Sequence, residues 1–290
     1  MVKDSSAILY GTLYIVATPI GNRDDMTFRA LDILKRVDAI LAEDTRYSGQ
    51  FLSLLGIKKP LISLHAHNED SKSEMIVREL LGGKSYALIS DAGTPLISDP
   101  GFPLVKLARA NQINVVPIPG ACALIAALSA AGVPCDLFTF AGFLPAKSHA
   151  RQQKLISLKT YQHTVVFYES MHRILDSIRD IAQVYGIDCQ LVLAKELSKS
   201  FEHFISGDCN EVIAWLLAET GRCKGEFVLI IPPRTSIHGN EDAAKKLLSI
   251  LLVELPLKQA VRVASKLTIS TKNELYRLAL SLSTPESVEK

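Results

Sequence analysis

The first segment whose residues could do chemistry is ISDAGTPLISDPG, residues 89–101. It places two aspartates, two glycines and two prolines within thirteen positions. Glycine permits a positive φ and close approach of a ligand to the backbone, and proline fixes a turn at low entropic cost. We expect residues 91–97 to form a rigid ledge at the end of a strand. Asp99 is expected to cap the following helix, with Pro100 in its first turn.

Three other segments carry similar turn chemistry: ATPIGN at 17–22, PIPGACA at 117–123 and AGFLPAKS at 141–148. One such loop is often only a tight turn, but four at corresponding places indicate a ligand site beyond the strand ends of an α/β sheet. No G-x-G-x-x-G follows the first predicted strand, which disfavours a nicotinamide site. No G-x-x-x-x-G-K-[ST] occurs, which excludes a P-loop NTPase.

Short β-rich runs alternate with helical patterns along the chain, and these elements must position the loops. Such alternation is typical of βα units around a mostly parallel sheet. The first series of strands is predicted at 13–17, 38–44, 60–65, 86–90 and 113–119. The second series is predicted at 137–143, 163–170, 189–197 and 226–233. We therefore predict an α/β fold with two α/β domains, residues 1–119 and 120–232.

Only helical periods remain after PPRTSIHGNED at 232–242. We predict a linker at 233–241 and a small all-helical C-terminal extension at 242–290. This extension is smaller than most autonomous domains, so we expect it to pack against the rest of the chain or against a partner.

Composition points to a soluble globular enzyme, since 48% of the 290 residues are hydrophobic and 21% are charged. The net charge is only +2, so any basic surface for nucleic acid must be local.

The five cysteines include no C-x-x-C pair, which disfavours a zinc site or disulfide framework and suits a reducing cytoplasm. The N-terminus lacks a signal-peptide layout, and the longest small-apolar run, 121–133, is too short to span a bilayer.

Nine segments, in chain order, resemble the tetrapyrrole-methylase superfamily and, more closely, its ribosomal branch. They are TPIGNRDDMTFRAL, AEDTR, LHAHNE, SDAGTPLISDPG, PIPGACA, GFLPAKS, FYESMHR, AKELSK and KGEFVLI. The resemblance runs from about residue 12 to 231, and the tail with ELPLKQA resembles the C-terminal extension of that branch. It implies an S-adenosylmethionine (SAM)-dependent 2′-O-ribose methyltransferase acting on a decoding-region cytidine, nucleotide 1402 of 16S rRNA. It also implies a cofactor in the cleft between the two domains, a homodimer, and free 16S rRNA or the assembled 30S subunit as partner, with no membrane.

Carried over residue by residue, the resemblance places the cofactor against residues of both domains. They are Ile20, Gly93, Thr94, Pro95, Leu96, Ile97, Cys122, Ala123, Tyr168, Ala194 and Phe227. The chain departs from the superfamily pattern at two of these positions. Thr94 replaces the usual aspartate of G-D-P, in agreement with the ribosomal branch, and Cys122 stands where serine is frequent. A thiol is a weak hydrogen-bonding group, so Cys122 is a poorer partner than serine.

Methyl transfer to a ribose hydroxyl depends mainly on alignment, helped by a base or by a cation at the forming alkoxide. The candidates at strand ends are Glu43, Asp44, His65, His67, Glu169, Lys195 and Glu196. Each carboxylate has the alternative role of helix cap or ion-pair partner, and Asp44 could simply cap the next helix. His65 and His67 would face opposite sides of an extended segment, so we predict no metal site. We predict Glu43 with Lys195 and Glu196 as the catalytic groups.

Phosphate contacts must supply much of the affinity for an rRNA. Lys147 and Arg151 belong to a basic helix, and Lys258, Arg262 and Lys266 recur at four-residue steps, forming one stripe on a helix of the tail. The first group could be an ordinary solvated face, and the stripe could equally be a dimer contact. Tyr47 and Phe143 could stack on a splayed base or belong to the core.

The sequence leaves two alternatives to an rRNA methyltransferase. A small-molecule methylase of the corrin-precursor kind is disfavoured by AEDTR, FLPAKS and the helical tail, which belong to the ribosomal branch. A ribosome-associated binding protein without chemistry is disfavoured by the intact Gly-Pro loops.

Overall fold

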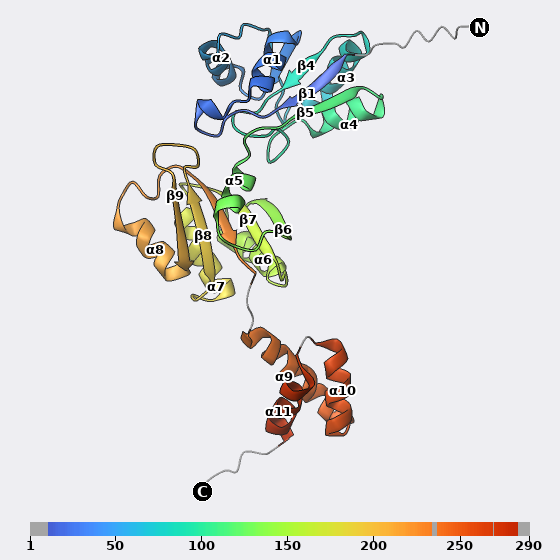
Figure 1. The fold of residues 1–290 in the computed structure, drawn as a ribbon, viewed down its shortest axis with the longest axis vertical. Helices are drawn as coiled ribbons and strands as arrows, with labels where there is room; N and C mark the ends of the chain where they lie inside the picture. The colour runs from blue at the N-terminus through green and yellow to red at the C-terminus, as the bar shows by residue number, and fades with distance from the viewer. Residues whose placement is uncertain (1–10, 234–236, 269, 284–290) are drawn as a thin grey trace, which may run out of the picture. The chain divides into compact units, whose positions relative to one another are not determined.

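The computed structural model describes residues 11–233, 237–268 and 270–283, with the backbone alone for 237–243 and 283 (Figure 1). The chain divides into two compact units, Met1–Pro233 and Arg234–Lys290. The expectation that the N-terminus has no signal-peptide layout concerns residues that include 1–10, and these ten lie outside the described residues. No helix of the described ranges is long and apolar enough to cross a membrane.

The first half of the larger unit, residues 11–119, contains a parallel sheet of order β3-β2-β4-β1-β5. Its strands are β1 (Thr12–Val16), β2 (Ala39–Ala42), β3 (Leu61–Ser63), β4 (Tyr86–Leu88) and β5 (Asn114–Ile118). Helices α1 (Phe28–Arg36) and α2 (Thr45–Leu54) pack on one face, and α3 (Glu69–Leu81) and α4 (Phe102–Ala110) pack on the other. The apolar runs of the strands are buried on both faces, as parallel βα units require.

The second half, residues 120–233, contains a mixed sheet of order β6-β7-β10-β8-β9. Its strands are β6 (Phe138–Phe143), β7 (Thr164–Ser170), β8 (Gln190–Lys195), β9 (His203–Asp208) and β10 (Glu226–Ile231). Only β6 and β7 pair in parallel, so the parallel order suggested by βα alternation does not extend to this sheet. The sequence did not predict β9. A connection of seven residues joins it to β8 and places Lys195 opposite His203, which forces an antiparallel pair.

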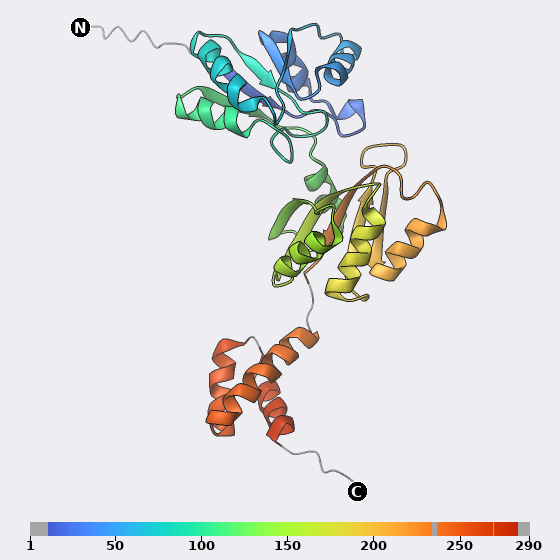
Figure 2. The same ribbon diagram turned by 180° about the vertical axis from the view of Figure 1, so that it is seen from behind.

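Three helices cover one face of the second sheet, α6 (Ser148–Leu158), α7 (Ile174–Tyr185) and α8 (Cys209–Ala218). They lie on the near side in Figure 2. The other face packs against the short α5 (Ala123–Ala130), through Leu124, Ala127 and Leu128. The two faces are therefore covered unequally.

Polar caps explain where the helices near the strand ends begin. Asp44 Oδ1 accepts from the backbone N–H groups of Arg46 (2.8 Å) and Tyr47 (3.2 Å), so its alternative role as a cap is confirmed. Helix α4 begins differently from the prediction. Its cap is Gly101, with φ +122°, whose N–H donates to Glu69 Oε2 (2.7 Å). The turn at Gly101 leaves Asp99 upstream of the helix, so the prediction that Asp99 caps α4 was wrong.

The smaller unit consists of α9 (Ile237–Glu254), α10 (Leu257–Leu267) and α11 (Lys272–Ser283). It has a core of its own, formed by Ala244, Leu248, Ala260, Val261, Ala264, Leu275 and Ala279. Helix α9 begins inside the range 233–241 that the sequence assigns to a linker.

Candidate functional site

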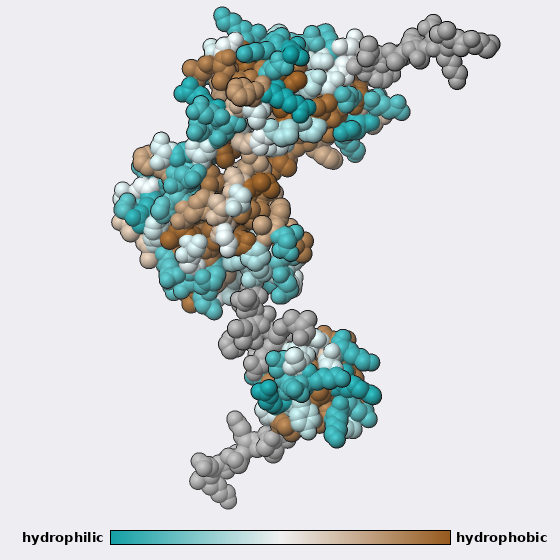
Figure 3. Space-filling model, in the orientation of Figure 1, coloured by the Kyte–Doolittle hydropathy of each residue, from teal (hydrophilic) through white to brown (hydrophobic). Residues whose placement is uncertain are grey.

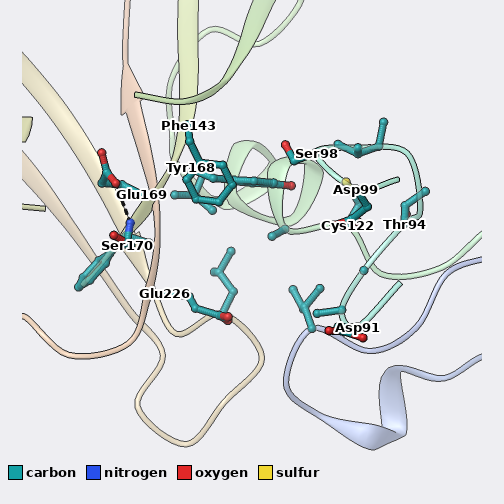
Figure 4. A pocket seen from close by; sticks show the side chains of 18 of the residues that line it. Asp91, Thr94, Ser98, Asp99, Cys122, Phe143, Tyr168, Glu169, Ser170 and Glu226 are labelled. Atoms are coloured by element: carbon teal, nitrogen blue, oxygen red, sulfur yellow. Dashed lines mark hydrogen bonds between the residues drawn. The ribbon is translucent and has the colours of Figure 1, made fainter. Parts of the chain in front are cut away.

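A cavity of about 440 Å³ in the larger unit is lined from both of its halves (Figure 4). The first half contributes the ledge, with Gly93, Thr94 and Ile97, and the loop after β1, with Ile20. The second half contributes the ends of β7, β8 and β10. The cavity therefore lies where the Gly-Pro loops were expected to meet a ligand.

Hydrogen bonds tie the ledge to the neighbouring loops. The N–H of Thr18 donates to the carbonyl of Gly93 (2.8 Å), and the N–H of Gly93 donates back to Thr18 (3.0 Å). Thr94 Oγ1 donates to the carbonyl of Ala121 (3.0 Å). Leu96 and Ser98 both have φ +73°, a conformation that costs free energy for residues other than glycine. The ledge is thus a strained loop that hydrogen bonds to neighbouring loops keep in place, as is typical of functional sites.

Gly93 stands at the tightest point of this ledge. It has φ +79°, and a Cβ built there would lie 3.3 Å from Ile20 Cγ2. Glycine keeps the backbone open toward the cavity at a position where any side chain would be both strained and crowded.

All the predicted cofactor-contacting residues except Pro95 and Leu96 line this cavity. Pro95 is buried, and the Leu96 side chain packs against the apolar core of the first half. The structure thus brings the predicted residues of both halves together around one space.

Tyr168 connects the second sheet to helix α5. Its hydroxyl accepts from the backbone N–H of Leu124 (3.1 Å), and its ring contacts Phe140 and Phe143 edge-on, with centroids 4.8 Å and 5.8 Å away. Burial raises the pKa of Tyr168, so its hydroxyl stays neutral. Figure 4 shows this ring directed across the cavity toward Cys122.

Five acidic residues line the same cavity, and three of them belong to two loops of the first half: Glu43 to the loop after β2, and Asp91 and Asp99 to the loop between β4 and α4. Burial raises the pKa of Glu43, and the neighbouring Asp91 raises it further. Burial also raises the pKa of Asp91, and it raises that of Asp99 to about 6. Asp91 Oδ1 is buried and has no hydrogen-bond partner among the described residues. This acidic cluster favours a positively charged ligand or a proton.

The three predicted catalytic residues do not meet. Glu43 lines the cavity, whereas Lys195 and Glu196 do not. Successive residues of a strand face opposite sides, so Ala194 on β8 faces the cavity while Lys195, buried, points to the other face of the sheet.

Glu196 belongs to a charged network beside the cavity. Its Oε1 accepts from Lys199 Nζ (2.8 Å) and from the N–H of Glu226 (2.9 Å). Burial would raise the pKa of Glu196, but the bonds from Lys199 and Glu226 outweigh it and lower the pKa. Lys199 Nζ also contacts Glu226 Oε2 (2.8 Å), and Glu226 lines the cavity. The sequence did not indicate this network, because residues 196–199 and 226 are far apart in the chain.

Two of the remaining proton-transfer candidates, Glu169 and His65, have structural partners. Glu169 is buried and accepts from Arg173 Nε (3.1 Å) and Ser177 Oγ (2.6 Å), which matches its alternative role in an ion pair. His65 Nε2 lies 3.0 Å from Asn68 Nδ2. Within the described ranges, no three His, Cys, Asp or Glu side chains are grouped to hold a metal ion.

The predicted RNA-contacting residues differ in accessibility. Lys147 is exposed at the start of α6, and Lys258, Arg262 and Lys266 are exposed along α10. Arg151 is instead 4% exposed, and its Nε lies 2.6 Å from Asp180 Oδ2. Its guanidinium also donates to two carbonyls, of Pro145 (3.3 Å) and Ala146 (3.1 Å). The structure places Arg151 in the interior, out of reach of a phosphate.

Residues 12–213 match the family described as tetrapyrrole (corrin/porphyrin) methylases, and residues 238–283 match the RsmI C-terminal HTH domain. The ribosomal RNA small subunit methyltransferase I of Haemophilus influenzae is 49% identical over 94% of this chain and 98% of its own length. The protein of the same name from Escherichia coli O157:H7 is 48% identical over 93% and 95%.

Solved structures share the fold at low identity. Diphthine synthase has a TM-score of 0.61 at 12% identity, covering 78% of this chain and 91% of its own. Uroporphyrin-III-C-methyltransferase from Thermus thermophilus has a TM-score of 0.54 at 17% identity, covering 77% and 94%.

Proposed function

The chain belongs to the tetrapyrrole methylase family, and from that premise we propose that it transfers a methyl group from SAM to the RNA of the small ribosomal subunit. The observation that carries this proposal is the match, over nearly the full length of both chains, to relatives named ribosomal RNA small subunit methyltransferase I. At the finer level, the proposed acceptor is the ribose 2′-hydroxyl of the cytidine at nucleotide 1402 in the decoding region of 16S rRNA.

The residues of the 440 Å³ cavity fit SAM. Ile20 and Ile97 offer apolar surface, and the ledge offers backbone that a Cβ at Gly93 would crowd. The carboxylates of Glu43, Asp91 and Asp99 complement the two positive charges that SAM carries on its sulfonium and amino groups. When bound, SAM supplies an activated methyl group.

The proposed chemistry needs alignment and one proton acceptor. Glu43 is the predicted catalytic residue that lines the cavity, and its raised pKa brings it nearer to that of an effective general base. Glu196 keeps a supporting role in the proposal, because it fixes Lys199 and Glu226 at the edge of the cavity. Lys195 has no role in it, since its side chain does not line the cavity.

The proposed partner is 16S rRNA or the assembled 30S subunit, which places the protein with the ribosomes of the cytoplasm. Lys147 and the stripe Lys258, Arg262 and Lys266 are exposed cations suited to phosphate. We also propose a homodimer. The thinly covered face of the second sheet leaves Ile125 and Leu137 more than half exposed, and Figure 3 shows apolar residues gathered on this half.

The direct test incubates the purified protein and radiolabelled SAM with 30S subunits from cells lacking this methylation, and in parallel with a tetrapyrrole precursor. We expect label in the rRNA and none in the tetrapyrrole. Label in the tetrapyrrole alone would contradict the proposal and favour a small-molecule methylase.

A further inference from the structure

A second cavity, of about 250 Å³, adjoins the larger one. The two share the four lining residues Ile20, Asp91, Ala92 and Glu226. Resting on the proposed function, we propose that this smaller cavity receives the target nucleoside, with its base against Tyr47, its phosphate at Arg23 and its ribose at Asp91. Its volume lies just below the usual range of small-molecule pockets, roughly 300–1,000 Å³, so it suits a single nucleoside turned out of its RNA.

An aromatic wall on α2 provides the stacking surface. Tyr47 and Phe51 are four residues apart, so they share one face of the helix, and both line the smaller cavity. Phe51 also packs against the core of the first half, whereas Tyr47 is 56% exposed. The Asp44 cap fixes the turn that carries Tyr47. Single-stranded RNA bases are commonly recognised by stacking on such a ring.

Among the residues that the structure describes, the smaller cavity has one cation available for a phosphate. Lys199 lines it but already contacts the carboxylates of Glu196 and Glu226. Arg23 lines it too, is exposed, and takes part in no ion pair among the described residues. A guanidinium presents several donors in a plane and pairs well with phosphate oxygens. Arg23 is therefore the side chain that would hold the backbone of the flipped nucleotide.

Asp91 occupies the wall common to both cavities. Its Oδ1 has no hydrogen-bond partner within the described residues, and the backbone of Asp44 provides one hydrogen bond to the carboxylate, so acceptor positions remain. A ribose hydroxyl is a donor of matching kind. Glu43, by contrast, lines only the larger cavity. A nucleoside whose ribose meets Asp91 would present its hydroxyl at the boundary with the cofactor-sized space.

The decisive experiment compares Tyr47→Ala with Tyr47→Phe, and Arg23→Ala with Arg29→Ala, an exposed arginine on α1 outside both cavities. Methylation kinetics are measured on 30S subunits lacking the modification, and the Kd for SAM is measured by calorimetry. Loss of base stacking should lower kcat/KM by about tenfold or more in Tyr47→Ala. Tyr47→Phe keeps a ring and should stay within about twofold of wild type, and the Kd for SAM should not change in either variant.

Arg23→Ala should raise KM and reduce the salt dependence of KM by about one phosphate contact, while Arg29→Ala should change neither. Wild-type kinetics in Tyr47→Ala would overturn the inference. A weakened Kd for SAM in Tyr47→Ala, with KM for the subunit unchanged, would also overturn it and assign the smaller cavity to the cofactor. Failure of the wild-type protein to methylate any 30S subunit is a separate result, which would overturn the proposed function on which the inference rests.

Discussion

Gly93 shows how one residue controls the ledge. Its positive φ would strain any side chain, and a Cβ there would press on Ile20. The sequence indicated the ledge, because glycine and proline mark a turn. It could not indicate the positive φ at Leu96 and Ser98, since nothing in those residue types requires it. The paired backbone bonds between Thr18 and Gly93 hold the start of the ledge, and they join residues far apart in the chain.

Replacing Gly93 by valine should abolish SAM binding, because the branched side chain would press on Ile20 and strain the turn. Gly132→Val is the matched control, since Gly132 also has a positive φ, +67°, but has open space around its Cβ position. Calorimetry with SAM measures the difference. Wild-type affinity in Gly93→Val would remove the ledge from the binding site.

Asp99 should make the stability of the ligand-free protein depend on pH. Burial raises its pKa from 3.8 in the unfolded chain to about 6 in the folded protein. The folded state then binds its proton more tightly, so this contribution is complete below about pH 3.8 and is lost as the pH rises through 6.

Asp99→Asn removes that titration, so the variant should gain stability relative to wild type between pH 4 and pH 7. Urea unfolding at several pH values measures the difference, with the exposed Asp24→Asn as control. Parallel pH curves for Asp99→Asn and wild type would show that Asp99 does not titrate in this way.

At the scale of elements, the sequence predicts the buried strands well and the edge strand poorly. Strands such as β2 and β10 are continuous apolar runs, which the alternation with helices makes recognisable. Strand β9 is a half-exposed edge strand, HFISGD, without such a run. Arg151 was misplaced for a related reason. A basic residue on a helix was expected to face solvent, but the carboxylate that buries it, Asp180, comes from another helix.

Replacing Arg151 by alanine should lower the free energy of unfolding by about 3–5 kcal/mol, because Asp180 would remain buried without its partner. Lys154→Ala, an exposed change on the same helix, should stay within about 0.5 kcal/mol of wild type. Urea denaturation provides both values. A small effect of Arg151→Ala on stability, together with weaker rRNA binding, would restore it to the RNA-contacting surface.

At the scale of the whole molecule, each of the two units has its own core. The sequence indicated the helical extension from its change of period, but the core in α9–α11 depends on which small residues face inward. Ala260, Val261 and Ala264 of α10 do so, leaving Lys258, Arg262 and Lys266 exposed. The extension is thus a compact unit with its own hydrophobic core and an exposed basic stripe.

Replacing Lys258, Arg262 and Lys266 together by alanine should weaken rRNA binding and reduce its salt dependence by about one unit of slope per lost phosphate contact. A matched triple variant, Lys246→Ala, Lys272→Ala and Arg277→Ala, removes the same charge from exposed positions on α9 and α11. Filter binding at several salt concentrations compares them. Unchanged binding with loss of the dimer would assign the stripe to the subunit contact.

The central claim, methylation of one ribose in the decoding region, is tested most directly by mass spectrometry of 16S rRNA from cells that lack this protein. We expect the 2′-O-methyl group on the decoding-region cytidine to disappear and to return when the wild-type chain is supplied. The Gly93→Val chain, supplied in the same way, should not restore the methyl group. A cytidine that keeps its ribose methyl in the cells without the protein would rule out this function.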